Sequence, residues 1–343
     1  MKKPPTSMFR QHRLFLLLLL LLFPALLLTA CSRSAASSSA QETDKLIRVG
    51  FSQVGAESDW RMANTASMLS ALSEENGFEL IFDNAKQHQE NQLLAIRNFI
   101  QQRVDYIVLA PIAESGWESV LQEAKTASIP VIVVDRQISV EDGDLYTCWV
   151  GSDFLAEGER IVGWLEETLQ SQGRTQETVR ILHIRGTDGA SAQIGRTKAL
   201  NDAVASHPSW SIAGVLPGEY TEAKSYELVR DFLKQDRDIQ VIYSENDNMS
   251  FGAMRALDEA GISYGDGGDV MILSFDAVRE AMRLCLEGKI NACAECNPLH
   301  GPRVASLIRQ MEAGETPEKL NYVKETLYTR DMLNEQLLQE REY

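Results

Sequence analysis

The segment LIRVGFSQVGAESDWRMANTASMLSALSEENGFELIF, residues 46–82, contains one complete strand–helix–strand pattern. Its two ends, Leu46 to Phe51 and Phe78 to Phe82, are short apolar runs of strand length. Between them, Trp60 to Asn76 repeats apolar residues at intervals of three and four and stops at Gly77, which is typical of a helix and its end. Because a helical crossover joins parallel strands, the segment predicts an α/β fold with a parallel sheet.

The same alternation continues to about residue 134 and then starts a second time. A helix is predicted over Gln89 to Arg103. Further strands are predicted at Tyr106 to Ala110, Ile129 to Val134, Val179 to Ile184, Trp210 to Leu216, Val241 to Tyr243 and Val270 to Phe275. We therefore expect two doubly wound parallel-sheet lobes.

The N-terminus has the order of a secretory signal. Lys2, Lys3, Arg10 and Arg13 precede the apolar run Leu14 to Leu22, and Leu28-Thr29-Ala30-Cys31 resembles a bacterial lipobox. A membrane-spanning helix is the alternative, but the run is short for a bilayer and Pro24 interrupts it. We expect residues 1–30 to be a lipoprotein signal peptide, Cys31 to carry the lipid, and residues 31–45 to form a Ser/Ala tether.

Length and charge narrow the classes of function. The chain has 343 residues, so even without the signal it exceeds the roughly 250 to 300 residues at which one core stops growing. Its 33 Lys and Arg stand against 49 Asp and Glu, a formal net charge of −16. This balance argues against nucleic acid as a partner, because phosphate binding needs a basic face.

Four cysteines besides Cys31 remain, at positions 148, 285, 293 and 296. The spacing Cys293-Ala294-Glu295-Cys296 raises a redox or zinc interpretation. If Lys289 to Glu295 is a strand, however, residues three apart point to opposite faces and are too far apart for a disulfide. We predict structural thiols, no metal and no cofactor.

Candidate ligand contacts follow the predicted strands, because ligands of open parallel sheets bind beyond the carboxyl ends of the strands. Polar or charged residues occupy that position in Ser52 to Arg61, Asp135-Arg136, Arg185 to Ala190, Ser244 to Asp247, and Asp276. Carboxylates and amides accept hydrogen bonds from sugar hydroxyls, guanidinium groups donate to them, and Trp60 or Trp117 could pack against a sugar ring. Taken singly, Asp247 and Asp276 could instead cap helix N-termini. Arg61 and Arg136 could be solvated surface groups, and Trp60 and Trp117 could be part of the core.

The sequence resembles the periplasmic binding proteins (type 1) of sugar ABC transporters, the group of ribose-, galactose- and arabinose-type proteins. The resemblance rests on the strand VIVVDR at 131–136 and on YSENDNMSFGA at 243–253. Its galactofuranose-binding members are the most similar, through VGFSQVGAESDWR at 49–61, QENQ at 89–92, API at 110–112, GWE at 116–118 and GAS at 189–191.

Carried over residue by residue, the resemblance implies a set of ligand-binding residues: Glu57, Ser58, Asp59, Trp60, Arg61, Asp135, Arg136, Arg196, Asn246, Asp276 and Glu295. It also implies three crossovers between the lobes, expected near Val150 to Gly151, Asp276 to Ala277 and Thr316 to Leu320. The N-terminal lobe is then 46–150 plus 277–318, and the C-terminal lobe is 151–276 plus 319–343. The lobes would close on the ligand about this hinge.

The implied function is that of an extracytoplasmic lipoprotein without enzymatic activity. It would be a monomer that captures a monosaccharide, galactofuranose by resemblance, and delivers it to an ABC permease with separate ATPase subunits. Its place would be the outer face of the cell membrane or the periplasm. The alternatives are another pentose or hexose as ligand, a membrane sensor or chemoreceptor as client, a sugar hydrolase, and a transcriptional regulator, although the signal occupies the place of a DNA-binding helix-turn-helix.

Overall fold

The first strand–helix–strand unit forms as its sequence predicts. In the computed structural model, which describes residues 45–343, β1 (Ile47–Gln53) pairs in parallel with β2 (Phe78–Asn84), with Phe51 opposite Phe82. The connecting helix α2 (Asp59–Ala71) begins at Ser58, whose hydroxyl accepts a hydrogen bond from the Arg61 N–H. The 3-10 turn η1 (Glu74–Asn76) ends at Gly77, which has a φ of 85°. The predicted signal peptide, Cys31 and all of the tether except residue 45 lie outside the described residues.

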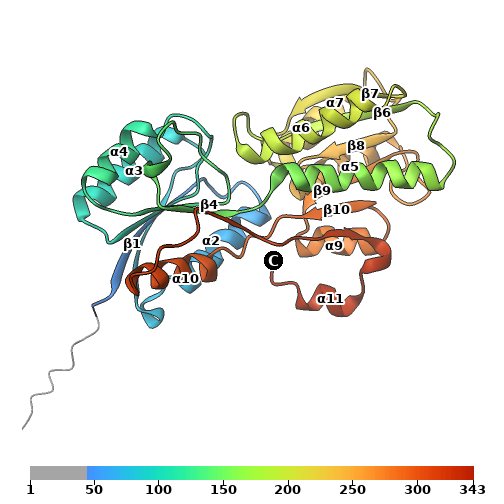
Figure 1. The fold of residues 1–343 in the computed structure, drawn as a ribbon. Coiled ribbons are helices and arrows are strands. Elements are labelled where there is room, and N and C mark those ends of the chain that lie inside the picture. Colours follow the sequence, from blue (N-terminus) through green and yellow to red (C-terminus); the bar gives the residue numbers. More distant parts are fainter. Residues whose placement is uncertain (1–44) are drawn as a thin grey trace, which may run out of the picture. The chain divides into compact units, whose positions relative to one another are not determined.

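The strands form two separate sheets, which Figure 1 shows with their covering helices. Each sheet has six strands. The first has the order β11-β5-β4-β3-β1-β2 and the second the order β12-β10-β9-β8-β6-β7. The remaining strands of the first sheet are β3 (Tyr106–Leu109), β4 (Val131–Val134), β5 (Cys148–Gly151) and β11 (Leu320–Tyr322). The second sheet contains β6 (Val179–Arg185), β7 (Trp210–Pro217), β8 (Val241–Ser244), β9 (Met271–Asp276), β10 (Ala292–Glu295) and β12 (Leu327–Thr329). Every pairing is parallel except that of β10 with β12, so the predicted fold of two doubly wound lobes is confirmed.

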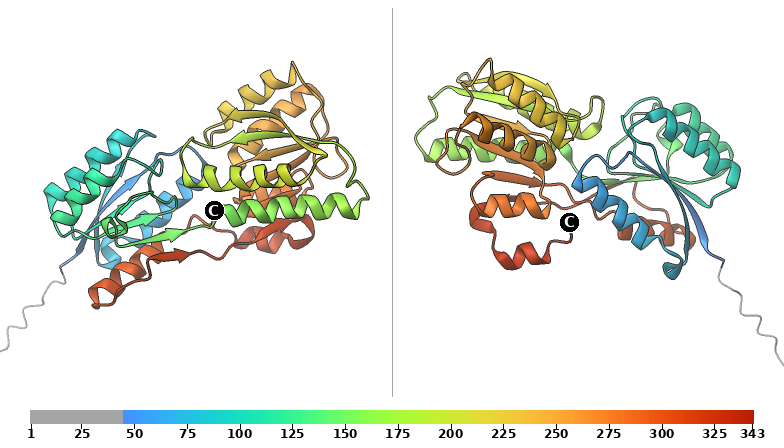
Figure 2. Two further views of the ribbon diagram at one scale, coloured as in Figure 1. Left: turned by 45° about the horizontal axis from the view of Figure 1, so that its top comes forward. Right: turned by 180° about the vertical axis from the view of Figure 1, so that it is seen from behind.

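The central strands of each sheet are buried on both faces, which explains why β3, β4 and β8 are nearly continuous apolar runs. In β3, Val108 packs into one core while its neighbours Ile107 and Leu109 pack into the other. Helices α2 and α10 (Gly301–Glu312) supply the first of these cores, and α3 (Gln89–Gln102) and α4 (Glu118–Thr126) the second. Around the second sheet lie α5 (Phe154–Ser171), α6 (Ser191–Ser206), α7 (Glu222–Leu233), α8 (Asp247–Ala260), α9 (Arg279–Leu286) and α11 (Glu335–Glu340), as two views in Figure 2 show.

Residues 46–343 form one compact unit, in which the chain crosses between the sheets three times. It leaves the first sheet after β5, returns between β10 and α10, and leaves again between β11 and β12. The predicted second and third crossovers are therefore wrong. Residues 277–295 do not belong to the first lobe, because Ala294 in β10 pairs with Phe275 in β9. Residues 320–322 do not belong to the second lobe, because Leu320 pairs with Trp149 in β5.

All four cysteines in the described part of the chain are buried and unbridged, which confirms that Cys293 and Cys296 do not form a disulfide. Cys293 lies within β10, and its thiol is 3.2 Å from a carboxylate oxygen of Asp247. Cys296 follows the end of the strand. From residue 45 onward, no helix combines the length and the apolar character needed to cross a membrane.

Candidate ligand-binding site

A cavity of about 30 Å³ lies between the two lobes, at the carboxyl ends of both sheets. This volume is well below the roughly 300 to 1,000 Å³ of small-molecule sites, so the side chains of the two lobes are packed closely around the site. The first lobe lines it with Glu57, Ser58, Trp60, Arg61, Asp135 and Arg136. The second lobe and the second crossover line it with Phe154, Ala192, Arg196, Tyr220, Asn246, Asp276 and Cys296.

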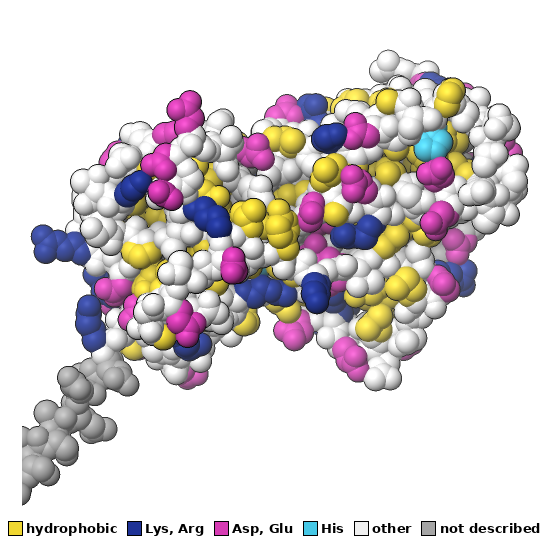
Figure 3. Space-filling view, viewed as in Figure 1, with side chains coloured by type: hydrophobic (Ala, Val, Ile, Leu, Met, Phe, Trp, Pro, Cys, Tyr) yellow, Lys and Arg dark blue, Asp and Glu magenta, His cyan; other side chains and the backbone are white. Residues whose placement is uncertain are grey.

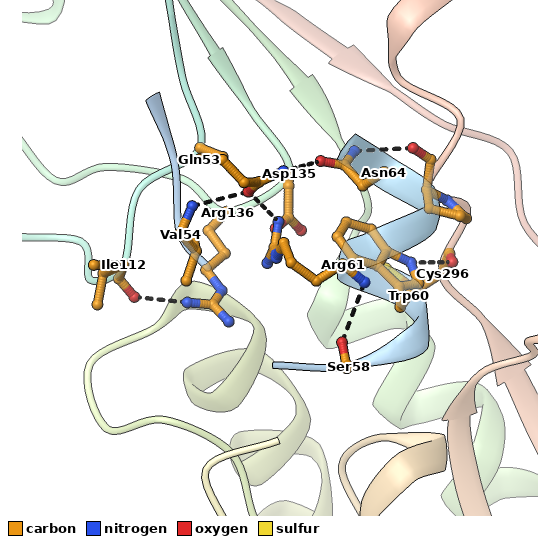
Figure 4. Close-up of polar contacts among 12 residues, drawn as sticks. Gln53, Val54, Ser58, Trp60, Arg61, Asn64, Ile112, Asp135, Arg136 and Cys296 are labelled. Atoms are coloured by element: carbon orange, nitrogen blue, oxygen red, sulfur yellow. Dashed lines mark hydrogen bonds and ion pairs between the residues drawn. The ribbon is translucent and has the colours of Figure 1, made fainter. Parts of the chain in front are cut away.

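Arg61 is the centre of the charge network on the first lobe. Its Nε donates to Glu57 Oε1 at 3.0 Å, its Nη2 to Asp135 Oδ2 at 2.7 Å, and its Nη1 to Gln53 Oε1 at 3.2 Å. Burial alone would lower the pKa of Arg61, but Asp135 and Glu57 hold it above its ordinary value. The guanidinium is thus a fixed cation that is only 2 % exposed, with its neighbours shown in Figure 4.

Arg136 lies beside this network and reaches the other lobe. Its Nη1 donates to the Ile112 carbonyl at 3.0 Å, and its Nη2 lies 3.9 Å from Glu57 Oε1. Its guanidinium carbon is 5.1 Å from the centre of the Tyr220 ring, a cation–π contact between the lobes. Burial would raise the pKa of Asp135, but Arg61 and then Arg136 keep it below its ordinary value, so this carboxylate is ionised.

Arg196 is the corresponding cation of the second lobe. Its Nε donates to Glu157 Oε2 at 2.8 Å, and its Nη2 lies 3.6 Å from Asp276 Oδ1. The rings of Phe154 and Phe275 lie within 5.4 and 4.7 Å of its guanidinium carbon. Burial raises the pKa of Asp276 well above its usual range, although Arg196 opposes this. Asp276 can therefore donate as well as accept a hydrogen bond.

The two aspartates that end the central strands share an unusual backbone. Asp135, directly after β4, has a φ of 64°, and Asp276, at the end of β9, has a φ of 104°. Residues other than glycine rarely adopt these conformations, and they cost on the order of 1 to 3 kcal/mol each. The surrounding fold holds both carboxyl groups in the cavity despite this cost.

Helix capping and cavity lining coincide at two residues. Ser58 caps α2, and Asn246 caps α8 by accepting a hydrogen bond from the Met249 N–H at 2.9 Å. The N-cap alternative for Asp247 and Asp276 is wrong, because Asn246 and Val278 hold those positions in α8 and α9. Asp247 instead accepts from the Ser274 hydroxyl and the Val278 N–H.

Two buried oxygen atoms of the cavity lining have no hydrogen-bond partner within residues 45–343. They are Glu57 Oε2 and the Tyr220 hydroxyl. The Glu57 side chain is 2 % exposed and Tyr220 is 5 % exposed. An unmet buried oxygen is costly, so both are positioned to bind polar groups of a ligand.

Three residues named from the sequence do not line the cavity. Asp59 is exposed and binds Asn248 of the other lobe. Glu295 accepts hydrogen bonds from Arg341 and Tyr343 near the C-terminus and from the Thr326 N–H. Trp117 is fully buried in the core beneath α3 and α4.

The sequence interpretation missed four lining residues: Phe154, Ala192, Tyr220 and Cys296. Tyr220 lies in the loop after β7, three residues beyond the end of the strand, so the strand-end rule could have found it. Phe154 and Ala192 lie in the first turns of α5 and α6 and carry no polar signal.

The lobes touch around the rim of the cavity, so the structure is closed. The Asp59 N–H donates to Asn248 Oδ1 at 3.0 Å, and Asn248 Nδ2 donates back to Asp59 Oδ2 at 3.1 Å. On another part of the rim, the Gln137 N–H donates to the Ser191 hydroxyl at 2.8 Å, and the Glu114 N–H donates to the Gly189 carbonyl at 2.9 Å. Two doubly wound lobes that close over a buried polar cavity define a binding protein of the hinged class.

Comparison with known proteins agrees with this class. The family model for the periplasmic binding protein domain matches residues 49–300. The galactofuranose-binding protein YtfQ of Escherichia coli K12 is 37 % identical over 295 residues, which cover 85 % of this chain and 90 % of that protein. A Mycobacterium smegmatis structure in complex with β-D-fucofuranose is 37 % identical with a TM-score of 0.79, over 83 % of this chain and 92 % of that one. The binding protein of the arabinose ABC transporter from Shewanella sp. ANA-3, bound to L-arabinofuranose, is 36 % identical with a TM-score of 0.79, over 86 % and 95 % of the chains.

The chain therefore belongs to the periplasmic binding protein family, in its type 1 sugar-binding branch. This family consists of binding proteins and not of enzymes.

Proposed function

We propose that this protein captures a monosaccharide in its five-membered ring form, with galactofuranose as the preferred ligand, and delivers it to an ABC importer. The observation that carries the proposal is the composition of the closed cavity. Three fixed guanidinium groups, the carboxyl groups of Glu57, Asp135 and Asp276, and the Asn246 amide surround a space closed by two lobes.

This composition suits a small polyol. Guanidinium groups donate to vicinal hydroxyls in a fixed plane, and carboxylates accept from them. The unpartnered oxygens of Glu57 and Tyr220 add polar contacts from both lobes. Trp60 and Phe154 offer apolar surface to the carbon face of a ring.

The choice of a furanose is supported by the relatives, whose names refer to galactofuranose, fucofuranose and arabinofuranose at 36 to 37 % identity. The continuous stretch Ser52 to Arg61, which supplies four lining residues, is also the part that most resembles the galactofuranose-binding members.

Partners and location follow from the same proposal. The protein acts as a monomer held to the outer face of the cell membrane by a lipid on Cys31, and its client is a permease with separate ATPase subunits. On the face shown in Figure 3, Lys and Arg side chains are scattered among Asp and Glu and form no broad basic surface.

Expression of Cys31→Ala in a bacterial host tests the anchor: unprocessed precursor is expected, and normal cleavage and lipidation would refute it.

The ligand is tested by thermal shift and calorimetry with galactofuranose, galactopyranose, ribose and arabinose. A ligand at 100 times its Kd stabilises the folded protein by about 2.7 kcal/mol. Galactofuranose should bind most tightly and be recovered unchanged, and small-angle scattering should show a smaller radius with ligand than without it. Tighter binding of galactopyranose would overturn the furanose assignment and leave the transport role in place.

A further inference from the structure

A second polar cluster lies where the three crossovers meet, beside the cavity. Ser152 belongs to the first crossover, Cys296 begins the second, and Glu325 lies in the third. Glu157, in the first turn of α5, completes the cluster. Ser152, Glu157 and Cys296 are buried and Glu325 is partly buried.

One carboxyl group connects all three crossovers. Glu325 Oε1 accepts from the Ser152 hydroxyl at 2.5 Å and from the Asn297 N–H at 2.8 Å. The Ser152 hydroxyl also lies 3.3 Å from the Cys296 thiol. One oxygen each from Glu157 and Glu325 and the Cys296 sulfur lie within 4.8 Å of one another. Any rotation of the lobes about the crossovers must act on this cluster.

The charges in the cluster do not balance if both glutamates are ionised. Arg196 neutralises Glu157 through Oε2, whereas Glu157 Oε1 is buried and has no partner in the described chain. Glu325 forms no salt bridge within residues 45–343. Two carboxylates held this close with little water favour one shared proton.

We propose that Glu157 and Glu325 share a single proton across the hinge, and that this proton positions Arg196 in the ligand cavity. On this proposal, a small rotation of the Glu325 side chain brings its carboxylic acid from within 4.8 Å to hydrogen-bond distance of the free oxygen of Glu157, and Glu157 keeps its other oxygen for the Arg196 guanidinium. Glu157 and Glu325 are positioning residues, because they act on the ligand through Arg196. This inference rests on the proposed function of the cavity.

The surrounding groups agree with Glu325 as the proton carrier. Burial first, and then the charge of Glu157, raise the pKa of Glu325 to about 9. Burial also raises the pKa of Glu157, but Arg196 and Arg160 favour its ionised form. The other titratable groups that face the pair are Cys296, Asp276, Tyr243 and Glu295, and Arg341 neutralises Glu295.

The proposal gives sugar affinity a defined dependence on pH. Opening the hinge admits water to the cluster and returns Glu325 toward its ordinary pKa of 4.5, so closure takes up a proton between pH 4.5 and about 9. Affinity is then highest at the acidic end of this window and falls as the pH rises through it. Above pH 9 the dependence on this proton ends.

The experiment compares wild type, Glu325→Gln and the control Glu318→Gln, which alters an exposed glutamate near the same crossover. Glutamine keeps a neutral donor at position 325 but cannot titrate. Calorimetry with galactofuranose should show affinity at least about tenfold weaker at pH 9 than at pH 6 for wild type and Glu318→Gln. Glu325→Gln should change by less than about twofold over the same range. Equal pH profiles for wild type and Glu325→Gln would overturn the coupling.

A second measurement does not depend on the sugar. Difference infrared spectra at pH 7 should show a protonated carboxyl band in wild type and Glu318→Gln that is lost in Glu325→Gln, and its absence from wild type would overturn the proposal whatever the ligand. The alternative to a shared proton is a zinc ion bound by the Glu157 oxygen, the Glu325 oxygen and the Cys296 sulfur. A thermal stabilisation by added Zn²⁺ that Cys296→Ser abolishes would replace the shared proton with a metal site.

Discussion

The indole N–H of Trp60 donates to the main-chain carbonyl of Cys296 at 2.6 Å, although the two residues are 236 positions apart. Trp60 lies in the first turn of α2 on the cavity wall, and Cys296 begins the second crossover. The Arg61 guanidinium carbon is 4.6 Å from the Trp60 ring centre, and the His300 ring meets the same indole edge-on at 5.9 Å. The cavity wall of the first lobe and the hinge are therefore packed as one structure.

The first prediction concerns Arg61 and Arg136. Arg61→Ala or Arg136→Ala should weaken galactofuranose binding by about 2 to 4 kcal/mol, roughly thirtyfold to a thousandfold, because buried carboxylates such as Glu57 lose a partner. Calorimetry measures the change. The control is Arg97→Ala, which removes an exposed ion pair with Glu123 and should alter binding by less than about 0.5 kcal/mol. Equal, small effects in all three variants would mean that the cavity arginines do not hold the ligand.

The second prediction separates rim contacts from ligand contacts. Asn248→Ala removes both hydrogen bonds to Asp59 across the rim and should weaken binding by about 0.5 to 1.5 kcal/mol, mainly through faster release. Surface plasmon resonance on immobilised protein measures the two rates. Asn76→Ala, which removes exposed hydrogen bonds to Ser70 and Ser73, is the control. A slower association with unchanged release would contradict this role for the rim.

The third prediction follows from the close approach of Gly186 to Tyr220. A Cβ atom at position 186 would lie 2.0 Å from the Tyr220 ring, so Gly186→Ala should displace the ring and destabilise the fold by about 1 to 3 kcal/mol. Sugar affinity should fall with it. At Gly163, inside α5, a Cβ meets nothing within 4 Å, so Gly163→Ala should stabilise the fold by about 0.5 to 1 kcal/mol. Urea unfolding of both variants checks the pair, and unchanged stability of Gly186→Ala would contradict the contact.

The fourth prediction concerns acid stability. Burial first lowers the pKa of His300 from 6.5 to about 4, although Asp135 opposes this. The unfolded chain therefore binds a proton that the folded protein does not, and stability falls as the pH drops from 6.5 to 4, by on the order of 3 kcal/mol. His300→Gln should lose this part of the pH dependence in urea unfolding, and His88→Gln, at an exposed histidine, should keep it. The same slope in both variants would assign the effect to other groups.

The local sequence pattern predicts most ends of the central strands to within about two residues, because strands buried on both faces are continuous apolar runs between turns. The positions of the crossovers are harder to predict. The sequence of β10 predicts a strand. Its pairing with β9, in which Ala294 lies opposite Phe275, depends on long-range packing that local periodicity does not encode. Glu295 was misplaced for the same reason, because its partners Arg341 and Tyr343 come from the far end of the chain.

Most of the lining residues that follow strand ends were predicted, whereas Phe154 and Ala192, in the first turns of α5 and α6, were missed. Arg61 and Asp135 were found through the loops after β1 and β4. Phe154 projects from a helix that begins only after the first crossover, so its place in the cavity depends on how the lobes close. No local signal specifies that geometry.

The loop after β1 has a consequence for how specificity can change. One continuous segment, Ser52 to Arg61, delivers Glu57, Ser58, Trp60 and Arg61 to the cavity, whereas the second lobe assembles its lining from five separate segments of the chain. Recombination between relatives could therefore exchange most of one wall of the cavity in a single event. The opposite wall could diverge only by scattered point substitutions. Chimaeras that graft this one loop offer the shortest route to new ligand preferences, with the second lobe left as a constant half of the site.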